Sequence, residues 1–258
     1  MPWFPLACPN MSTSTPNLEE AAFLRHYDPA LYDRPSFSVD LVIFTAHEAQ
    51  LQVLLVKRGA HPYKGCWALP GGFLDLHRDS TLQACAERKL LEKTGVKAPY
   101  LEQLRTYGSR DRDPRHWTAT AAYFALIAAP AVHLGRGPDA VRWAPVCDRA
   151  VADPLAFDHA TILADAIERL RAKLEYTHIA VHLLPEEFTL PQLQQVYEII
   201  LQQPLDKSSF RRRVAEADML EPVARQSRNG SGRPAQFYRF RDYDRRTFFP
   251  RSISRNAR

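Results

Sequence analysis

The chain has 258 residues, of which 45% are hydrophobic, so it is long enough for one or two domains with a substantial core. Its four cysteines are widely spaced and form no Cys-x-x-Cys pair, a pattern that indicates neither a disulfide framework nor a zinc site. No apolar run reaches the length of a membrane span, and the first residues lack the pattern of a signal peptide. We therefore expect a cytoplasmic protein without a membrane segment.

The charge of the chain is concentrated at its C-terminal end. Residues 206–258 contain fourteen basic side chains, thirteen of them arginines, and six acidic ones, a net charge of +8. Because the whole chain carries +5, the first 205 residues carry −3. This asymmetry indicates a nucleic-acid partner for the C-terminal part. The alternative, a solvated basic tail, fits residues 245–258 but does not explain residues 211–213, which lie inside an amphipathic helix.

The N-terminal third begins with a polar segment and continues with strand-like runs. Residues 1–17 are rich in Ser, Thr and Pro and are typical of a disordered leader, followed by a short helix over residues 19–27. Residues 38–45 and 51–58 are β-rich and are separated by a turn, which predicts two strands. A loop over residues 59–65 then leads to the most informative motif of this part of the chain.

That motif combines a Gly-Gly turn, Gly71 and Gly72, with a helical segment that carries Arg88, Leu90 and Glu92 and ends in Gly95 and Val96. It resembles the Nudix box, in which a loop joins the turn to a helix whose carboxylates hold a divalent metal against a nucleoside diphosphate. The loop is two residues longer than in the commonest form, so Asp75 and Asp79 have no certain alignment with the motif. The matching positions are Gly71, Gly72, Arg88, Leu90, Glu92, Gly95 and Val96. The resemblance implies a Nudix α/β/α sandwich.

Two positions of this motif depart from the Nudix pattern. Lys89 and Lys93 stand where the family has metal-binding glutamates, and their spacing places them on one helix face. Ammonium groups cannot coordinate magnesium, but they can neutralise a pyrophosphate directly. Because Arg88 and Glu92 keep ion-pair spacing, we interpret the site as one that binds a diphosphate and has largely lost its hydrolytic chemistry. The alternative is that both lysines are solvated and the helix is a scaffold.

The next segment predicts two strands joined by a charged loop. Residues 100–108 and 117–127 are strand-like, and the polar loop over residues 109–116 is long enough to reach over a pocket. We predict that Arg112 or Arg115 contacts phosphate or ribose; the alternative is a surface loop with self-paired Arg and Asp. Candidate partners for stacking on a base, which are otherwise core residues, are Tyr63, Trp67, Phe73, Tyr107 and Trp117. The predicted ligand-binding set is Arg58, Trp67, Gly71, Gly72, Phe73, Arg88, Lys89, Glu92, Lys93, Arg112 and Arg115, with no metal and no required cofactor.

The C-terminal half begins with a predicted connector helix. After a short strand over residues 141–145, Asp158 is expected to cap this helix, whose apolar stripe includes Ile162, Ala166 and Leu170. A capping box at residues 189–192 starts a helix that runs to about residue 202, with Phe188 and Leu193 as its hydrophobic staple. We therefore expect the helix that follows Asp158 to connect the two halves of the chain.

A second, basic helix follows and is in turn followed by a hairpin. Asp206 caps this helix, with Leu205 and Phe210 as its staple. Strand-like residues 220–224 and 236–240 flank a basic hairpin tip. This order is that of a winged helix-turn-helix, with the basic helix in the major groove and the wing along the DNA backbone or the minor groove. The candidate DNA contacts are Lys207, Ser208, Ser209, Arg211, Arg212, Arg213, Arg228 and Arg233.

The two halves together are similar to the NrtR family, Nudix-related transcriptional regulators of NAD metabolism. The similarity spans roughly residues 36–242, and its specific segments are residues 188–198, 205–212 and 232–240. It implies a homodimer that represses NAD biosynthesis or salvage genes by binding double-stranded operator DNA, with ADP-ribose or a related dinucleotide as effector. The expected parts are a leader (1–35), a nucleotide-sensing domain (36–150), a connector helix (151–175), a winged helix (176–242) and a basic tail (243–258).

Two other functions stay open at this point. The first is a metal-dependent Nudix hydrolase of ADP-ribose-like nucleoside diphosphates, in which the remaining carboxylates hold one magnesium; Glu92 and Asp79 are the residual catalytic candidates. The second is an RNA-binding or scaffolding protein, which would prefer single-stranded RNA to duplex DNA. The acids available to the hydrolase hypothesis are Asp75, Asp79, Glu87 and Glu92.

Overall fold

A computed structural model describes residues 18–95, 97–98, 100–128, 140–226 and 235–241, which fall into two units, residues 1–34 and 35–258. In the first unit, α1 (Leu18–His26) is followed by the 3-10 turn η1 (Pro29–Leu31), where Asp28 accepts a hydrogen bond of 2.8 Å from the amide of Ala30. The helix confirms the one expected over residues 19–27, whereas the predicted leader lies outside the described residues.

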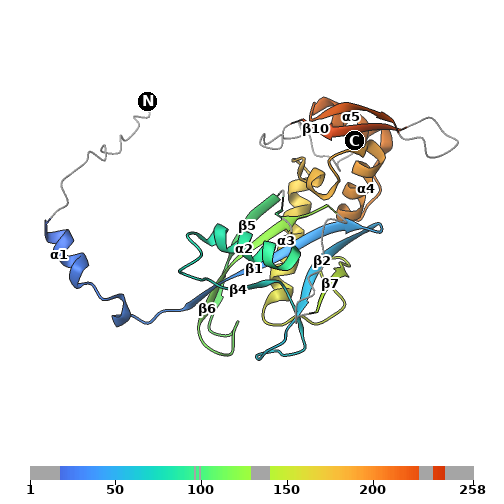
Figure 1. Ribbon diagram of the computed structural model, residues 1–258. Coiled ribbons are helices and arrows are strands. Elements are labelled where there is room, and N and C mark those ends of the chain that lie inside the picture. The colour runs from blue at the N-terminus through green and yellow to red at the C-terminus, as the bar shows by residue number, and fades with distance from the viewer. Residues whose placement is uncertain (1–17, 96, 99, 129–139, 227–234, 242–258) are drawn as a thin grey trace, which may run out of the picture. The chain divides into compact units, whose positions relative to one another are not determined.

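The second unit is built on a seven-stranded sheet (Figure 1). Its central path runs β3-β2-β1-β6-β5, with β4 paired to β1 and β7 paired to β2. Only the pairing of β1 with β6 is parallel among the described strand pairs of this sheet. The strands are β1 (Ser36–His47), β2 (Gln50–Lys57), β3 (Trp67–Ala68), β4 (Gly71–Phe73), β5 (Tyr100–Ser109), β6 (Thr118–Leu126) and β7 (Val141–Pro145). The short strands β3 and β4 were not predicted from the sequence.

Alternating side chains of β1 explain why both faces of the sheet are covered. Val39, Leu41 and Ile43 pack with residues of α2 (Leu82–Thr94), while Val42 and Phe44 belong to the core that contains α3 (His159–Leu174). Successive strand residues point to opposite faces, so a strand buried on both sides is a continuous apolar run. The predicted α/β/α sandwich is therefore confirmed.

The C-terminal part is a winged helix built on strong local signals. It comprises η2 (Ile179–Leu183), β8 (Phe188–Thr189), α4 (Leu190–Leu201), α5 (Lys207–Glu216), β9 (Leu220–Gln226) and β10 (Gln236–Phe240), with the strands in the order β8-β10-β9. The predicted capping box is present, because the Thr189 hydroxyl accepts from the amide of Gln192 and the Gln192 side chain accepts from the amide of Thr189. Asp206 caps α5 by accepting from the amide of Ser209 at 2.8 Å. Strand β8 was not predicted.

One hydrophobic core joins the sandwich to the winged helix. Residues of β1, β2, α3, α4 and α5 belong to the same cluster of buried side chains. Figure 1 shows α4 and α5 gathered at one end of the sheet, and β2 contacts α4 there. None of the helices in the described part of the chain has the length and apolar character needed to span a bilayer.

Aromatic ring contacts lie at this junction. Tyr100 of β5 lies 5.1 Å from His182 of η2, and His178 lies 4.4 Å from Phe240 of β10, measured between ring centroids. Both histidines are buried. Burial, with a smaller contribution from His178, lowers the pKa of His182 to about 4.

We expect the protein to become less stable as the pH falls, because of His182. The folded state keeps the imidazole neutral, whereas an unfolded histidine with a pKa of about 6.5 takes up a proton. The stabilisation is therefore fully present above pH 6.5 and is lost as pH falls toward 4. This group alone makes the protein about 2 kcal/mol less stable at pH 5 than at pH 7. Urea unfolding of the wild type and of His182→Gln at both pH values measures the effect, and an equal pH dependence in the two proteins would contradict it.

Candidate functional site

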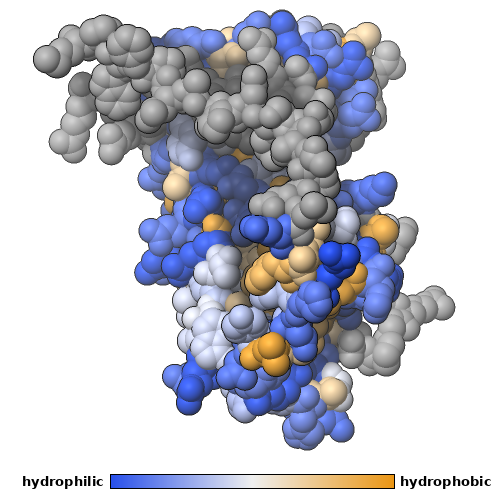
Figure 2. All heavy atoms as spheres, turned by 90° about the vertical axis from the view of Figure 1, so that its left-hand side faces the viewer, coloured by the Kyte–Doolittle hydropathy of each residue, from blue (hydrophilic) through white to orange (hydrophobic). Residues whose placement is uncertain are grey.

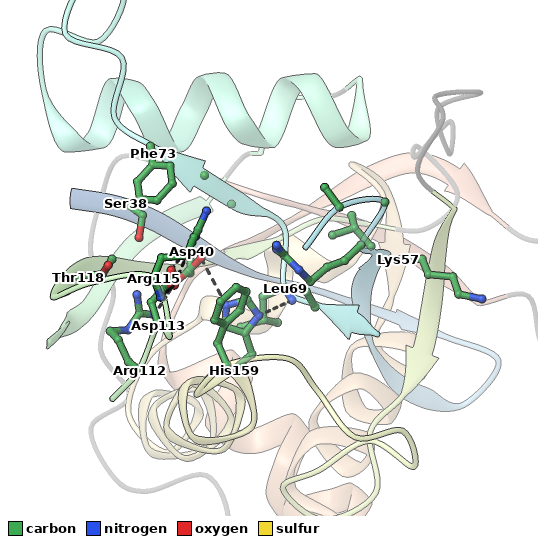
Figure 3. Close-up of a pocket in the computed structure, with 18 of the residues that line it drawn as sticks. Ser38, Asp40, Lys57, Leu69, Phe73, Arg112, Asp113, Arg115, Thr118 and His159 are labelled. Carbon is green, nitrogen blue, oxygen red and sulfur yellow. Dashed lines mark hydrogen bonds and ion pairs between the residues drawn. The ribbon is translucent and has the colours of Figure 1, made fainter. Parts of the chain in front are cut away.

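A cavity of about 370 Å³ opens beside the Gly-Gly turn of the predicted Nudix motif. Its walls come from β1, the end of β2, strand β4, the loop after β5 and the start of α3, as Figure 3 shows. Seven residues of the predicted ligand-binding set line this cavity: Arg58, Gly71, Gly72, Phe73, Lys93, Arg112 and Arg115. The other four, Trp67, Arg88, Lys89 and Glu92, are not among its lining residues.

Gly71 is required by the close approach of two strands. A Cβ atom at this position would lie 2.4 Å from the carbonyl oxygen of Val39 and 2.5 Å from Oδ1 of Asp40. Strand β4 pairs with β1 at this point, so any side chain would separate the two strands. The glycine thus brings the backbone of β4 against β1 at the wall of the cavity.

Helix α2 carries the altered Nudix residues. It begins at Thr81, whose hydroxyl accepts from the amide of Ala84, and ends at Gly95, which has a left-handed φ of 70°. Lys89 lies over the Gly-Gly turn, and its Nζ atom would be 3.1 Å from a Cβ atom added to Gly72. The same Nζ atom lies 3.7 Å from Oε2 of Glu92. Lys93 reaches the cavity one turn later. Sequence spacing placed the two lysines on one helix face, but only Lys93 lines the cavity.

Arg88 forms ion pairs with Asp79 and Glu92, the two residual catalytic candidates. Its guanidinium donates to the two carboxylate oxygens of Asp79 at 2.7 and 2.5 Å and to Oε1 of Glu92 at 3.1 Å. The Asp79 carboxylate is 1% exposed, and its hydrogen bonds from Arg88 hold its pKa well below the usual range. A bidentate arginine pair occupies the oxygens that a metal would need. Arg88, Asp79 and Glu92 therefore fix the loop before α2 to the helix.

Cations converge on the cavity from two sides. Arg58 lies with its guanidinium 4.7 Å above the ring of Phe157, and Arg115 lies 5.1 Å above the ring of Phe73. Burial and the charge of Arg115 both lower the pKa of Arg58, as expected where like charges are gathered. Arg115 is also held by Asp113 through bonds of 2.9 and 2.6 Å. This part of the cavity favours an anionic ligand.

Arg112 differs from the other loop arginine because it is buried. Its Nη2 atom donates to Asp40 at 3.0 Å and to Asp158 at 2.8 Å, and its Nε atom donates to Asp158 at 3.0 Å. Asp158 stands at the N-cap of α3, as predicted, but its side chain makes no cap hydrogen bond, because its carboxylate is held by Arg112. A phosphate or ribose contact by Arg112 or Arg115 stays a prediction.

Three of the predicted stacking aromatics have other partners. Trp67 is covered by Arg142, whose guanidinium lies 4.1 Å from its ring, and the Tyr107 hydroxyl donates to Asp165 at 2.7 Å. Tyr63 packs edge-on against Phe157 at 4.8 Å. Phe73 is the member of this group that lines the cavity.

Helix α5 presents a basic face, with one exception to the predicted contacts. Lys207, Arg211 and Arg212 are exposed, and the described surface at the top of Figure 2, where α5 and β10 lie in Figure 1, is mostly hydrophilic. Arg213 is 7% exposed, so its assignment to the DNA surface is wrong. It follows Phe210 by three residues and therefore shares the inward face of the helix. Ser208 is exposed and Ser209 is half-buried, while Arg228 and Arg233 lie outside the described residues.

Two family profiles match the chain. The profile of the NUDIX domain covers residues 35–166, and that of the NrtR DNA-binding winged helix domain covers residues 180–240. Over 237 residues, 91% of the chain, the sequence is 46% identical to the ADPR responsive transcriptional repressor NtrR of Acinetobacter baylyi, 93% of which is covered. The chain belongs to the NrtR family.

Solved structures agree with membership of the NrtR family. Shewanella oneidensis NrtR complexed with a 27mer DNA has a TM-score of 0.78 and 43% identity, over 84% of this chain and 99% of that one. The NUDIX domain of the same protein complexed with ADP ribose has a TM-score of 0.54 and 45% identity, over 58% of this chain and 98% of that one. The predicted family and fold class are therefore confirmed.

The residues of this NrtR-family chain do not fit the divalent metal that a Nudix box implies. Lysines, Lys89 and Lys93, occupy two positions that hold metal ligands in the motif. The carboxylates of Asp79 and Glu92 accept hydrogen bonds from Arg88. Within the described ranges, no group of three or more His, Cys, Asp or Glu side chains is arranged to hold a metal ion. Cationic side chains of the protein, among them Arg58, Lys93 and Arg115, line the cavity.

Sequence reasoning missed several cavity residues of this NrtR-family chain. Asp40, Asp113, Phe157 and His159 all line the cavity, although none was named as a candidate. Asp40 carried a usable signal, because it is the only charged residue in an apolar run from Val39 to Phe44. The Nδ1 atom of buried His159 accepts a hydrogen bond of 2.9 Å from the amide of Leu69, and its Nε2 atom lies 3.6 Å from Asp40. Burial is the main reason why the pKa of His159 is lowered.

Proposed function

We propose that this NrtR-family chain is a nucleotide-responsive repressor that binds operator DNA and senses ADP-ribose, or a related dinucleotide, in the Nudix cavity. The observation that carries the proposal is the cation-lined cavity, in which Lys93, Arg58 and Arg115 face the space beside the Gly-Gly turn. Such a site binds a diphosphate through charge-assisted hydrogen bonds and has no need of a metal. The Acinetobacter baylyi relative, a repressor described as ADPR responsive, supports this ligand class.

The winged helix supplies the DNA-binding part of the proposal. A homodimer places two α5 helices about one duplex turn apart, so that each enters the major groove of one half-site. A nucleotide bound in the cavity then changes the spacing or orientation of the two helices. The target genes in this proposal encode NAD biosynthesis or salvage enzymes, and the protein acts in the cytoplasm.

Binding of the purified protein to duplex DNA from the region flanking its own gene tests this function. Fluorescence anisotropy with and without ADP-ribose measures the response, while the same sample is assayed for ADP-ribose hydrolysis in magnesium. Nanomolar, sequence-specific binding that the nucleotide modulates without being consumed supports the proposal. Weak, salt-sensitive DNA binding together with steady ADP-ribose turnover that Glu92→Gln abolishes would instead assign the chain as a Nudix hydrolase.

Arg212→Ala is expected to weaken operator binding by about 1 to 3 kcal/mol, the range for a base-reading arginine. Arg212 is exposed on α5 and its ion pair with Glu216 is long, at 3.9 Å, so folding stability is expected to be unchanged. Arg149→Ala is the matched control, since this exposed arginine has a similar 3.7 Å pair with Glu168 outside the winged helix. Operator affinity equal to that of the wild type for Arg212→Ala would remove this residue from the DNA contact.

A further inference from the structure

The first residues of α3 are part of the cavity wall. Phe157 and His159 line the cavity, and the intervening residue, Asp158, is the N-cap of the helix. Phe157 has a φ of 57°, in the left-handed region that a bulky residue rarely adopts. Its ring is held between Arg58, at 4.7 Å, and Tyr63, at 4.8 Å. Strained backbone next to a ligand site is typical of switch segments.

An ion pair ties this strained segment to β1, beside the hydrogen bond that the Leu69 amide donates to His159. The guanidinium of Arg112 donates to both carboxylate oxygens of Asp158, at 2.8 and 3.0 Å, and to Asp40 of β1 at 3.0 Å. Only 6% of the Arg112 side chain is exposed, whereas the Asp158 side chain is 25% exposed. Because Asp158 is committed to Arg112, the first amides of α3 receive no side-chain cap. Asp158 therefore has two competing partners, the arginine and the helix start.

The far end of α3 is attached to the DNA-binding helices. Arg171, in the last turn of α3, donates through Nε to the carbonyl of Ile200 of α4 at 3.0 Å. Tyr197 of α4 then meets Phe210 of α5 edge-on at 5.5 Å. With 16 residues, α3 is a rigid element about 24 Å long between the two sites. A shift at its first turn would therefore reach α4 and α5 through these contacts.

We propose that the ion pair between Arg112 and Asp158 couples the cavity to the winged helix: an anionic ligand in the cavity weakens the pair and so changes the position of α3. This coupling rests on the proposed function and assigns a positioning role to residues that need not touch the nucleotide.

The physical basis is competition for one guanidinium. Arg112 is already shared by two carboxylates, so a diphosphate nearby draws on the same positive charge and repels the more exposed carboxylate of Asp158. Once released, Asp158 can accept hydrogen bonds from the amides at the helix start, as aspartate does at most N-caps. The change also lets Phe157 leave its left-handed conformation. The Asp158–Arg112 ion pair and the capped start of α3 are thus two discrete states. Binding at the cavity or at the winged helix shifts the equilibrium between them.

Asp158→Asn is the variant that tests the coupling, because it keeps the shape and the capping ability of the side chain but removes its charge. Asp153→Asn is the matched control, since Asp153 is also paired with an arginine, but that arginine, Arg142, does not line the cavity as Arg112 does. ADP-ribose affinity is measured by calorimetry without DNA. Anisotropy measures the DNA affinity without and with saturating ADP-ribose, and the DNA affinity ratio is the factor by which the two affinities differ. Hydrogen exchange of residues 156–163 reports the start of α3 directly.

We expect Asp158→Asn to bind ADP-ribose within about threefold of the wild type and to reduce the DNA affinity ratio at least fivefold, the lower range of measured allosteric couplings. ADP-ribose should alter hydrogen exchange at residues 156–163 in the wild type and in Asp153→Asn, but not in Asp158→Asn. A wild-type ratio in Asp158→Asn, or loss of its ADP-ribose binding, would overturn the coupling and leave the proposed function intact. A wild type that does not bind ADP-ribose would overturn the proposed function itself.

Discussion

Replacing Lys93 with glutamate is expected to weaken ADP-ribose binding by on the order of 100-fold. Lys93 is the helix α2 cation that lines the cavity, and a charge-assisted hydrogen bond contributes about 1.5 to 3 kcal/mol. Removing it and adding a negative charge next to a diphosphate should cost about 3 kcal/mol, which corresponds to two decades in Kd. Calorimetry in EDTA measures this effect without any contribution from divalent metal. Lys97→Glu is the control, because Lys97 is exposed beyond the end of α2 and does not line the cavity.

The double variant Lys89→Glu with Lys93→Glu separates two explanations of the lysines. If they replace the metal of a Nudix box, restoring both carboxylates should make ADP-ribose binding depend on magnesium, with affinity low in EDTA and partly recovered in magnesium. Solvated lysines on an ordinary scaffold helix predict no change in either buffer. Wild-type affinity of Lys93→Glu in EDTA would show that this cation does not bind the diphosphate.

Phe210→Ala is expected to reduce the free energy of unfolding by about 3 to 5 kcal/mol, the range for deleting a buried aromatic ring. Phe210 is 1% exposed, packs edge-on against Tyr197, and anchors α5 in the core that also contains the sandwich. Urea denaturation measures the loss of stability. We also expect weaker DNA binding under conditions in which the protein is still folded, because α5 loses its fixed position on α4.

Leu76→Ala is the control for this variant. Leu76 is 82% exposed, so its truncation should leave stability within about 0.5 kcal/mol of the wild type. A loss of less than about 1 kcal/mol in Phe210→Ala would show that the anchoring contact is absent in solution.

The winged helix was predictable because its signals are local. The capping box at Thr189 and the cap at Asp206 each act within a few residues, and both are present as predicted. Strand β7 also matches its predicted bounds, residues 141–145. Strands β3, β4 and β8 were not predicted because each has only two or three residues and is defined by its pairing, β3 with the preceding strand β2, β4 and β8 with strands farther away in sequence. Pairing of this kind leaves no periodicity in the sequence.

The cavity was less predictable because its chemistry depends on long-range contacts. The Gly-Gly turn and Lys93 came from one motif, but Asp40 and Asp158 meet Arg112 across 72 and 46 residues of sequence. Sequence alone could not show that Arg112 is buried beside these acids, nor that Arg112 keeps the Asp158 side chain from capping α3. The predicted DNA contact of Arg213 has a similar explanation, since a basic residue on a basic helix gives no sign in the sequence that it faces inward. Electrostatic partners are set by the tertiary fold.

The hydrophobic core that joins the sandwich to the winged helix limits how this regulator can be rebuilt. A biosensor made by grafting the nucleotide-binding half onto another DNA-binding module would leave the apolar side of α3 without the α4 residues that share its core. It would also remove the Ile200 carbonyl that accepts from Arg171. A working chimera therefore has to include a replacement helix that covers this surface, or to keep α4 and exchange only α5 and the wing.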